Sequence, residues 1–398
     1  MGLNDTPSAN RIHIGFFGLR NAGKSSLVNA FTNQDAAIVS DTAGTTTDPV
    51  YKSMELLPLG PVSIIDTPGI DDAGALGDKR VQKTKQVLEK TDIAILVTDA
   101  SKKLCDAEYE LIEMFKQRDI PYIIALNKTD LISEEIKAEK NTVVVSALEK
   151  TGIDRLKEKT AHLIKTEEKG FCIVSDIIKG GDKVVLVTPI DESAPKGRMI
   201  LPQQQVMRDV LDSDALCFLT KETTYKSCLE AINGKPALVV TDSQAFAKIS
   251  RETPPDIPLT SFSILMARMK GFLETAVKGV GAINNLKDGD TILISEGCTH
   301  HRQCNDIGTV KLPRLLKKYT GKDFNFEFSS GGGFPDELKK YAIIIHCGAC
   351  MIPSKAVLYR MKCAQKVGIP FTNYGIALAY MNGILERCIQ MFNLKPGE

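Results

Sequence analysis

The sequence has almost no net charge, no tryptophan and no long apolar run. Its 398 residues carry 50 Lys and Arg against 49 Asp and Glu, a net charge of +1, which gives no electrostatic reason to expect nucleic-acid or membrane binding. No uninterrupted run of about 18 apolar residues occurs, so we expect no transmembrane helix. Residues Met1 to Asn10 are polar and contain no apolar signal core, so we expect a cytoplasmic protein.

The composition is that of a soluble globular protein, with 43% hydrophobic and 25% charged residues. The length suffices for two or three domains. In a cytoplasmic chain we expect the ten cysteines to be free thiols. Most of them should be buried, and a clustered subset would indicate a metal site.

The stretch from Gly18 to Ser25 fits the phosphate-binding pattern G-x-x-x-x-G-K-[ST]. An apolar run with Ile12 and Phe17 predicts a strand before it, and a helical pattern follows. Backbone N–H groups of such a loop turn inward around a phosphate at a helix N-terminus. Lys24 would reach the outer phosphates and Ser25 would bind Mg²⁺. The predicted nucleotide contacts of this loop are Gly18, Asn21, Ala22, Gly23, Lys24, Ser25 and Ser26.

Two further segments predict the γ-phosphate side of this site. A threonine of the polar stretch 44–48, Thr46, would complete the Mg²⁺ shell when the γ-phosphate is present. Asp66 ends a predicted strand (62–65) and would hold Mg²⁺. The N–H of Gly69 would sense the γ-phosphate.

Asn127-Lys128-Thr129-Asp130 follows another apolar strand and predicts a guanine site. The carboxylate of Asp130 can accept hydrogen bonds from N1–H and N2–H₂ of guanine, a donor pair that adenine lacks. Lys128 would lie along the base plane, and the backbone at Ser146 and Ala147 would contact O6. Together with the phosphate loop, these motifs predict an α/β GTP-binding domain.

This segment resembles the bacterial GTPases of the Era and MnmE type. Ile70 stands where many small GTPases carry a water-orienting glutamine. Asn21 stands where K⁺-activated members carry a potassium ligand, so the resemblance implies that K⁺ replaces the missing group; an ordinary turn role for Asn21 stays open. The expected catalytic residues are Lys24, Asn21, Thr46 and Gly69.

The chain is predicted to contain three domains, a GTP-binding domain over 1–167 and two further domains over 168–261 and 262–398. In residues 168–261, strands alternate with helices, which favours a parallel sheet. No catalytic group of residues appears there, so this domain is a candidate for oligomerisation. Its cysteines are expected to be buried thiols: Cys172, Cys217 and Cys228. The fold class is therefore α/β, a P-loop GTPase followed by two smaller parallel-sheet units.

The third domain places cysteines and histidines behind two predicted strands. Residues 291–295 lead into Cys298-Thr299-His300, and 341–345 lead into His346-Cys347-Gly348-Ala349-Cys350. Ligands of open parallel sheets bind at this carboxyl edge. The residues leave three interpretations open: an iron–sulfur cluster, a zinc site with His300 or His346 as fourth ligand, or a redox C-x-x-C pair.

Over its whole length the sequence resembles the HydF family of FeFe-hydrogenase maturation GTPases, on the cysteine and histidine motif just given. The resemblance implies a 4Fe-4S cluster on Cys298, Cys347 and Cys350. His300 and His346 are candidates for a fourth iron ligand or for hydrogen bonds to the cluster sulfurs. It also implies a homodimer through the middle domain. The protein would carry the di-iron H-cluster precursor from radical-SAM maturases to the FeFe-hydrogenase apoprotein.

Two other functions compete with this one. The first is a ribosome- or tRNA-associated GTPase with a structural zinc domain, against which the balanced charge argues. The second is a cysteine redox enzyme under nucleotide control.

In the third predicted domain, residues 262–398, an apolar pattern from Ile376 to Met391 predicts one amphipathic helix.

Overall fold

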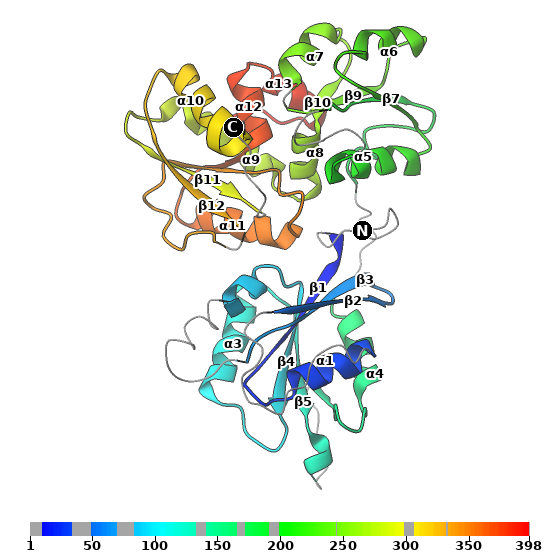
Figure 1. The fold of residues 1–398 in the computed structure, drawn as a ribbon, viewed down its shortest axis with the longest axis vertical. Helices are drawn as coiled ribbons and strands as arrows, with labels where there is room; N and C mark the ends of the chain where they lie inside the picture. The colour runs from blue at the N-terminus through cyan, green and yellow to red at the C-terminus, as the bar shows by residue number, and fades with distance from the viewer. Residues whose placement is uncertain are drawn as a thin grey trace. The chain divides into compact units, whose positions relative to one another are not determined.

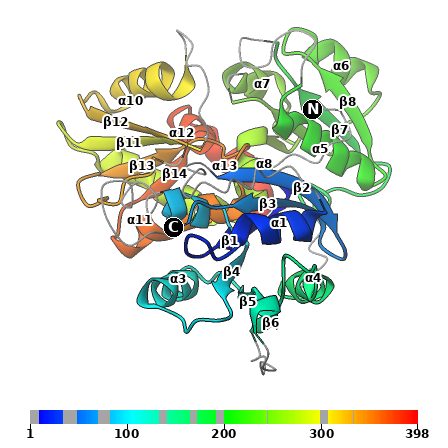
Figure 2. The ribbon, with the colours of Figure 1, turned by 60° about the horizontal axis from the view of Figure 1, so that its bottom comes forward.

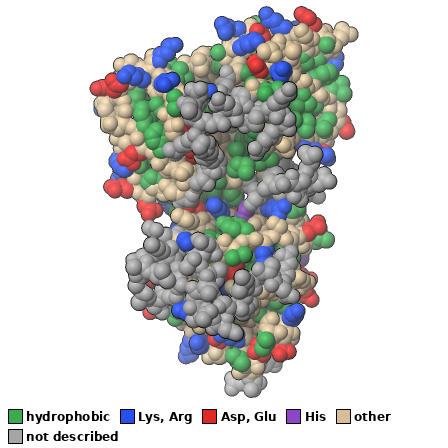
Figure 3. All heavy atoms as spheres, viewed as in Figure 1, with side chains coloured by type: hydrophobic (Ala, Val, Ile, Leu, Met, Phe, Trp, Pro, Cys, Tyr) green, Lys and Arg blue, Asp and Glu red, His purple; other side chains and the backbone are tan. Residues whose placement is uncertain are grey.

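A computed structural model describes residues 10–33, 49–69, 83–132, 141–164, 172–190, 199–243, 245–297, 306–331 and 333–397. The chain divides into two compact units, Met1–Glu168 and Lys169–Glu398 (Figure 1). No helix among these residues is long and apolar enough to cross a membrane. On the face drawn in Figure 3, both units carry Lys and Arg side chains as well as Asp and Glu, in keeping with the balanced charge.

The first unit is built on a six-stranded sheet of order β2-β3-β1-β4-β5-β6, in which β2 alone is antiparallel to its neighbour. Helices α1 and α4 lie on one face and α3 on the other (Figure 2). The strands are β1 (Ile12–Phe17), β2 (Val50–Leu56), β3 (Gly60–Asp66), β4 (Ile93–Asp99), β5 (Tyr122–Asn127) and β6 (Thr142–Val144). The helices are α1 (Lys24–Thr32), α3 (Asp106–Gln117), η2 (Thr129–Leu131) and α4 (Ile153–Ala161).

The central strands of this sheet are apolar on both sides because helices cover both faces. All six residues of β4 from Ile93 to Thr98 are buried, as expected for a parallel strand between two helical layers. Parallel strands leave all their carboxyl ends at one edge, and the predicted nucleotide motifs follow those ends. The fold thereby collects segments that lie up to about 130 residues apart in the sequence.

The second unit begins with the middle sheet, a parallel sheet of order β10-β9-β7-β8. Helices α5 and α8 pack on one face, and α6 and α7 on the other. The strands are β7 (Lys183–Val187), β8 (Leu216–Thr220), β9 (Leu238–Thr241) and β10 (Leu259–Ser261). The helices are α5 (Leu201–Asp212), α6 (Tyr225–Ala231), α7 (Phe246–Glu252) and α8 (Phe262–Met269).

The C-terminal sheet of the same unit is also parallel, with the order β12-β11-β13-β14 (Figure 1). Its strands are β11 (Thr291–Glu296), β12 (Asn325–Ser330), β13 (Ile343–His346) and β14 (Phe371–Asn373). Its helices are α9 (Leu273–Val280), η3 (Gly281–Asn285), η4 (Ile307–Lys311, a π-helix), α10 (Leu312–Thr320), α11 (Ser354–Lys366), α12 (Tyr374–Met381), α13 (Leu385–Ile389) and η5 (Gln390–Phe392). The predicted class, a GTPase-type unit followed by two smaller parallel sheets, is confirmed.

The two sheets of the second unit are tied together by side chains that bind backbone groups across the unit. Arg387 of α13 donates to the carbonyls of Ser250, Thr253, Pro254 and Ile257 at the end of α7 and beyond it. Asn373 at the end of β14 donates to the carbonyl of Ser263 in α8. Four carbonyls that accept from one guanidinium resist separation, because parting the two elements would break several charge-assisted hydrogen bonds at once.

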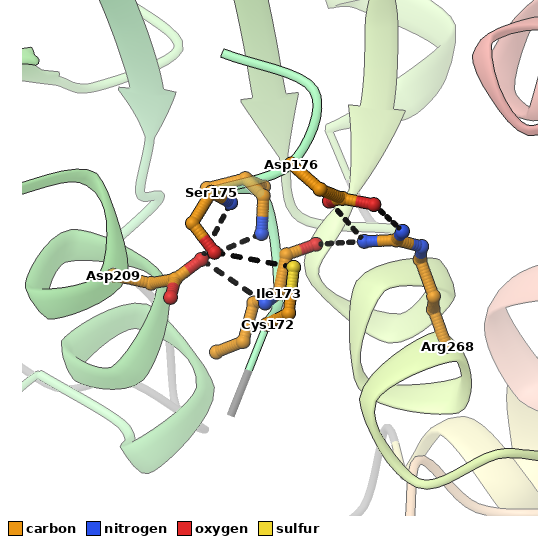
Figure 4. A network of polar contacts seen from close by, with 7 residues as sticks. Cys172, Ile173, Ser175, Asp176, Asp209 and Arg268 are labelled. Atoms are coloured by element: carbon orange, nitrogen blue, oxygen red, sulfur yellow. Dashed lines mark hydrogen bonds and ion pairs between the residues drawn. The ribbon is translucent and has the colours of Figure 1, made fainter. Parts of the chain in front are cut away.

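A polar network fixes the first described residues of the second unit (Figure 4). One carboxylate oxygen of Asp209 on α5 accepts three backbone N–H groups, from Ile173 (3.0 Å), Val174 (2.6 Å) and Ser175 (2.9 Å). Arg268 of α8 donates to the carbonyl of Ile173 and forms a salt bridge with Asp176. Because several charge-assisted bonds converge on one short segment, its backbone has little freedom.

Candidate functional site

The predicted phosphate loop connects β1 to α1, and two of its glycines are required by its shape. Gly18 has φ +145°, and a Cβ there would lie 2.2 Å from the carbonyl oxygen of Val97. Gly23 has φ +85°, immediately precedes α1, and a Cβ there would lie 2.3 Å from Nδ2 of Asn127. The loop therefore ends at a helix N-terminus, whose free N–H groups and dipole favour an anion.

Lys24 is buried within this loop rather than extended into solvent. Its Nζ donates to the carbonyl of Leu19 at 2.7 Å. The predicted γ-phosphate sensor, Gly69, lies against the same loop, since a Cβ on Gly69 would be 2.8 Å from Cα of Arg20 and 3.2 Å from Nζ of Lys24. The structure thus brings Lys24 and Gly69 together, as the sequence predicts.

Asp66 has the character of a cation ligand. It ends β3 and is 2% exposed. Burial raises the pKa of Asp66, while a side-chain hydrogen bond with Ser25 and the charges of Lys24 and Lys52 lower it. A buried carboxylate is costly unless nearby cations and donors compensate its charge. Asp66 and Ser25 therefore fit Mg²⁺, whose preferred ligands are oxygens.

The base-binding motif is joined to the phosphate loop through Asn127 at the end of β5. Its Nδ2 donates to the carbonyl of Ala22 at 2.9 Å, and its Oδ1 accepts the N–H of Ala147 at 3.0 Å. The hydroxyl of Ser146 donates to the carboxylate of Asp130. One buried amide therefore fixes the phosphate loop and the 146–147 segment relative to each other.

Asp99, which belongs to none of the predicted motifs, fixes the position of Lys128. The Nζ of Lys128 lies 2.7 Å from Oδ2 of Asp99 at the end of β4. Burial alone would raise the pKa of Asp99, but hydrogen bonds from Lys128 and Ser101 outweigh it and lower the pKa to about 2. Its place at a carboxyl strand end was the signal that could have identified it.

Several predicted residues lie outside the described residues: Thr46, Ile70, Cys298 and His300. Of the other nucleotide contacts, Asn21 is exposed in the loop with φ +61°. Ser26 lies in the first turn of α1. The left-handed backbone of Asn21 is one that Asn tolerates better than most residues.

The second candidate site lies at the carboxyl edge of the C-terminal sheet. Ser295 of β11 pairs with His346 of β13, and the N–H of Cys347 donates to the carbonyl of Ser295 at 2.8 Å. The sulfur of Cys347 accepts the N–H of Gly297 at 3.1 Å and that of Ala349 at 3.4 Å. Gly297 immediately precedes Cys298 in the sequence.

Cys350 lies in the same short loop, between β13 and α11. Burial raises the pKa of Cys350, whereas the charge of Lys270 and two backbone N–H groups lower it. Backbone N–H groups aimed at sulfur favour the thiolate, the form that binds metals. No group of three metal-binding side chains is found in the described part of the chain, and the third predicted thiol, Cys298, lies outside that part.

His346 is fully buried, and both of its ring nitrogens have partners. Nδ1 lies 2.9 Å from the carbonyl oxygen of Cys347, so Nδ1 carries the proton, and Nε2 accepts from Nη1 of Arg360 at 3.1 Å. Burial and the charge of Arg360 lower the pKa of His346 to about 3. This arrangement favours a structural, hydrogen-bonding role for His346 over that of a metal ligand.

The chain matches three family models in succession. Residues 13–128 match the 50S ribosome-binding GTPase model, residues 173–271 the hydrogen maturase F dimerization domain, and residues 274–391 the hydrogen maturase F tetramerization domain. The two hydrogen maturase F models together cover more than half of the chain.

Curated relatives match a smaller part. The tRNA modification GTPase MnmE of Alkaliphilus metalliredigens is 28% identical over 54% of this chain and 49% of its own length. GTPase Der of Wolinella succinogenes is 38% identical over 39% of this chain and 36% of its own length. The chain thus spans less than half the length of these relatives.

Solved structures with a similar fold include Era of Aquifex aeolicus, at 20% identity and a TM-score of 0.36, covering 60% of this chain and 97% of that one. NFeoB of S. thermophilus is 26% identical with a TM-score of 0.32, covering 38% of this chain and 61% of that one.

The family models place a GTPase domain before two hydrogen maturase F domains. The chain is therefore a GTPase that belongs to the hydrogen maturase F family.

Proposed function

We propose that this protein is a GTP-hydrolysing scaffold that binds a 4Fe-4S cluster through Cys298, Cys347 and Cys350. We also propose that it delivers the di-iron precursor of the H-cluster to the FeFe-hydrogenase apoprotein. The observation that carries the proposal is the pair of N–H groups on the sulfur of Cys347, one of them from the residue before Cys298. When bound, the cluster would supply an iron site for the precursor.

This proposal predicts that Cys347→Ala loses iron but keeps GTPase activity. The measurement is iron, sulfide and zinc content of anaerobically reconstituted protein, with low-temperature EPR after dithionite reduction. We expect about four irons per wild-type chain and loss of the reduced-cluster signal in the variant. Cys217→Ala is the matched control, because burial raises the pKa of Cys217 to about 11 and keeps that thiol protonated.

A single zinc and no iron in the wild-type protein would contradict the cluster and favour the second candidate function. That candidate is an RNA-associated GTPase with structural zinc, and it is motivated by the similarity to tRNA modification GTPases. The similarity covers about half of the chain or less, and the net charge is +1. Co-purified RNA together with stoichiometric zinc would support it.

Asn21 is proposed to hold K⁺ beside the nucleotide. Hydrolysis is expected to slow at least about tenfold when NaCl replaces KCl at equal ionic strength, because a fixed cation stabilises charge that develops on the phosphates. Asn21→Gly should abolish the K⁺ dependence, since glycine removes the amide and adopts φ +61° without strain. Phosphate release measures both effects; equal wild-type rates in the two salts would remove K⁺ from the mechanism.

The middle sheet is proposed to form a homodimer through its edge strand β8. Leu216 and Leu219 on this strand are 50% and 45% exposed, and an edge strand has backbone groups that a second copy can pair with. Light scattering tests this: a monomeric mass at micromolar concentration would contradict it.

Delivery requires partners that supply and receive the precursor, and we propose radical-SAM maturases and the hydrogenase apoprotein. The test is hydrogen evolution by apo-hydrogenase after incubation with this protein produced beside the maturases. Cys347→Ala should give none, and activity equal to that of the wild type would contradict delivery from the cysteine site.

A further inference from the structure

Lys270 is a buried lysine whose ammonium reaches the loop of the two cysteines. It is the residue that follows α8 and is 2% exposed. Its Nζ donates to the carbonyl oxygen of Ile352 at 2.7 Å. Ile352 lies two residues beyond Cys350, so the ammonium enters the cysteine loop itself.

The same contact leads to the segment of the third predicted cysteine. The side chain of Ile352 packs on Gly297, because a Cβ on Gly297 would lie 2.7 Å from Cδ1 of Ile352. Gly297 in turn donates its N–H to the sulfur of Cys347. Lys270, Ile352, Gly297 and Cys347 are thus linked in one continuous set of contacts.

A neutral N–H or O–H donor could satisfy the carbonyl of Ile352. The hydrogen bond therefore does not explain why a positively charged side chain is buried at this position. Lysine is almost never fully buried unless it is paired. Among the described residues Lys270 forms no salt bridge with a carboxylate, and the groups whose negative charge would raise its pKa are the sulfurs of Cys350 and Cys347. Burial lowers the pKa of Lys270 to about 8, and these two sulfurs oppose that change.

We propose that Lys270 is a positioning residue of the cysteine site whose buried charge compensates the negative charge of a cluster held by Cys347 and Cys350, and so raises the reduction potential of that cluster. The inference rests on the proposed function. It also assigns a part of the site to the region of the dimerization model, residues 173–271, whereas both cysteines lie in the tetramerization model.

The physical basis is the charge difference between the two redox states. One-electron reduction by dithionite adds one negative charge to the cluster and breaks no bond to the protein. A nearby positive charge stabilises the more negative state more strongly, and burial strengthens the interaction because water screens it less. Removing the charge should therefore make reduction less favourable.

Three substitutions separate the charge of Lys270 from its hydrogen bond. Lys270→Gln keeps an N–H donor for Ile352 but is neutral, Lys270→Met removes both, and Lys270→Arg keeps the charge. Lys278→Met is the matched control, because Lys278 is on α9 of the same unit, 55% exposed, and paired with Glu274. Circular-dichroism melting and GTP hydrolysis verify that each variant is folded.

The measurement is the midpoint potential from a dithionite titration followed by EPR, together with iron content. We expect Lys270→Gln and Lys270→Met to lower the equilibrium constant for reduction at least tenfold, which is 59 mV for one electron. Lys270→Arg and Lys278→Met should stay near the wild-type potential. A higher midpoint potential in the neutral variants, or an unchanged midpoint potential in neutral variants that hold their full iron content, would overturn the inference.

Three further outcomes also support or overturn the proposed role of the Lys270 charge. A Lys270→Gln protein that behaves as wild type while Lys270→Met is shifted would assign the effect to the hydrogen bond and overturn the role of the charge. If the neutral variants hold no iron, retention by Lys270→Arg supports the inference and loss by Lys270→Arg overturns it. Wild-type protein without iron would overturn the proposed function and with it this inference, whereas equal potentials overturn the inference alone.

Discussion

Lys24→Ala is expected to reduce GTP hydrolysis at least about 100-fold, the scale of losing one fixed charged donor at a site of developing negative charge. The ammonium of Lys24 is buried at the loop, 2.7 Å from the carbonyl of Leu19. It is also close to the position of a Cβ on Gly69. Because the side chain is already fixed there, little conformational entropy is lost when a phosphate binds.

The test of Lys24→Ala is phosphate release at saturating GTP, with nucleotide affinity from a fluorescent GTP analogue. Lys157→Ala is the control, since Lys157 lies on α4 of the same unit and pairs only weakly with Asp154, at 3.9 Å. Iron content should be unchanged, because the cysteine site belongs to the other compact unit. A rate within tenfold of wild type would contradict the assigned role of Lys24.

The places of the described nucleotide motifs were predictable, because each of these motifs directly follows an apolar strand. A parallel sheet brings such strand ends to one edge whatever their separation in sequence. The same rule predicted that the segments after residues 291–295 and 341–345 share one carboxyl edge, and the N–H of Cys347 does bind the carbonyl of Ser295 on β11. Local pattern and topology were sufficient in both cases.

Long-range side-chain contacts were not predictable by this rule. The pair of Lys270 and Ile352 joins residues that are 82 positions apart, and nothing in the neighbourhood of Lys270 distinguishes it from a solvent-exposed lysine. Likewise, Nε2 of His346 accepts a hydrogen bond from Arg360 on α11, a contact that the local sequence does not indicate. Such contacts depend on how helices pack over a sheet, which the hydrophobic pattern alone does not specify.

Two local predictions were wrong for identifiable reasons. The expected single helix from Ile376 to Met391 is two helices, α12 and α13, because Gly383 has φ +70° and follows Asn382, a turn signal within the apolar pattern. Cys172, Cys217 and Cys228 were expected to be buried thiols but are all half-buried. Cys217 lies on β8, an edge strand, where only one side of the ladder is covered.

The second prediction of large effect concerns the base. Asp130→Asn is expected to weaken GTP binding by on the order of 100-fold. A site built to hydrogen-bond two particular polar groups rejects a ligand when the match leaves some of those groups unpaired. The carboxylate of Asp130 can accept from both N1–H and N2–H₂ of guanine, whereas an asparagine amide offers one acceptor and one donor. That donor would oppose a donor of guanine.

The same amide matches xanthine, which carries an N1–H donor beside a C2 carbonyl acceptor. Asp130→Asn should therefore prefer XTP to GTP, and hydrolysis of the two nucleotides at subsaturating concentration measures the preference. The backbone frame should persist in the variant, since Asn127 fixes the motif through Ala22 and Ala147.

Asp154→Asn, on the exposed side of α4, is the matched control and should retain the wild-type preference. The hydroxyl of Ser146, which donates to Asp130 in the wild-type protein, can donate equally to the amide oxygen of asparagine. This bond would leave the amide N–H₂ facing the base, the orientation that xanthine requires. An Asp130→Asn protein with an unchanged preference for GTP would remove Asp130 from base recognition and leave the guanine assignment without its carboxylate.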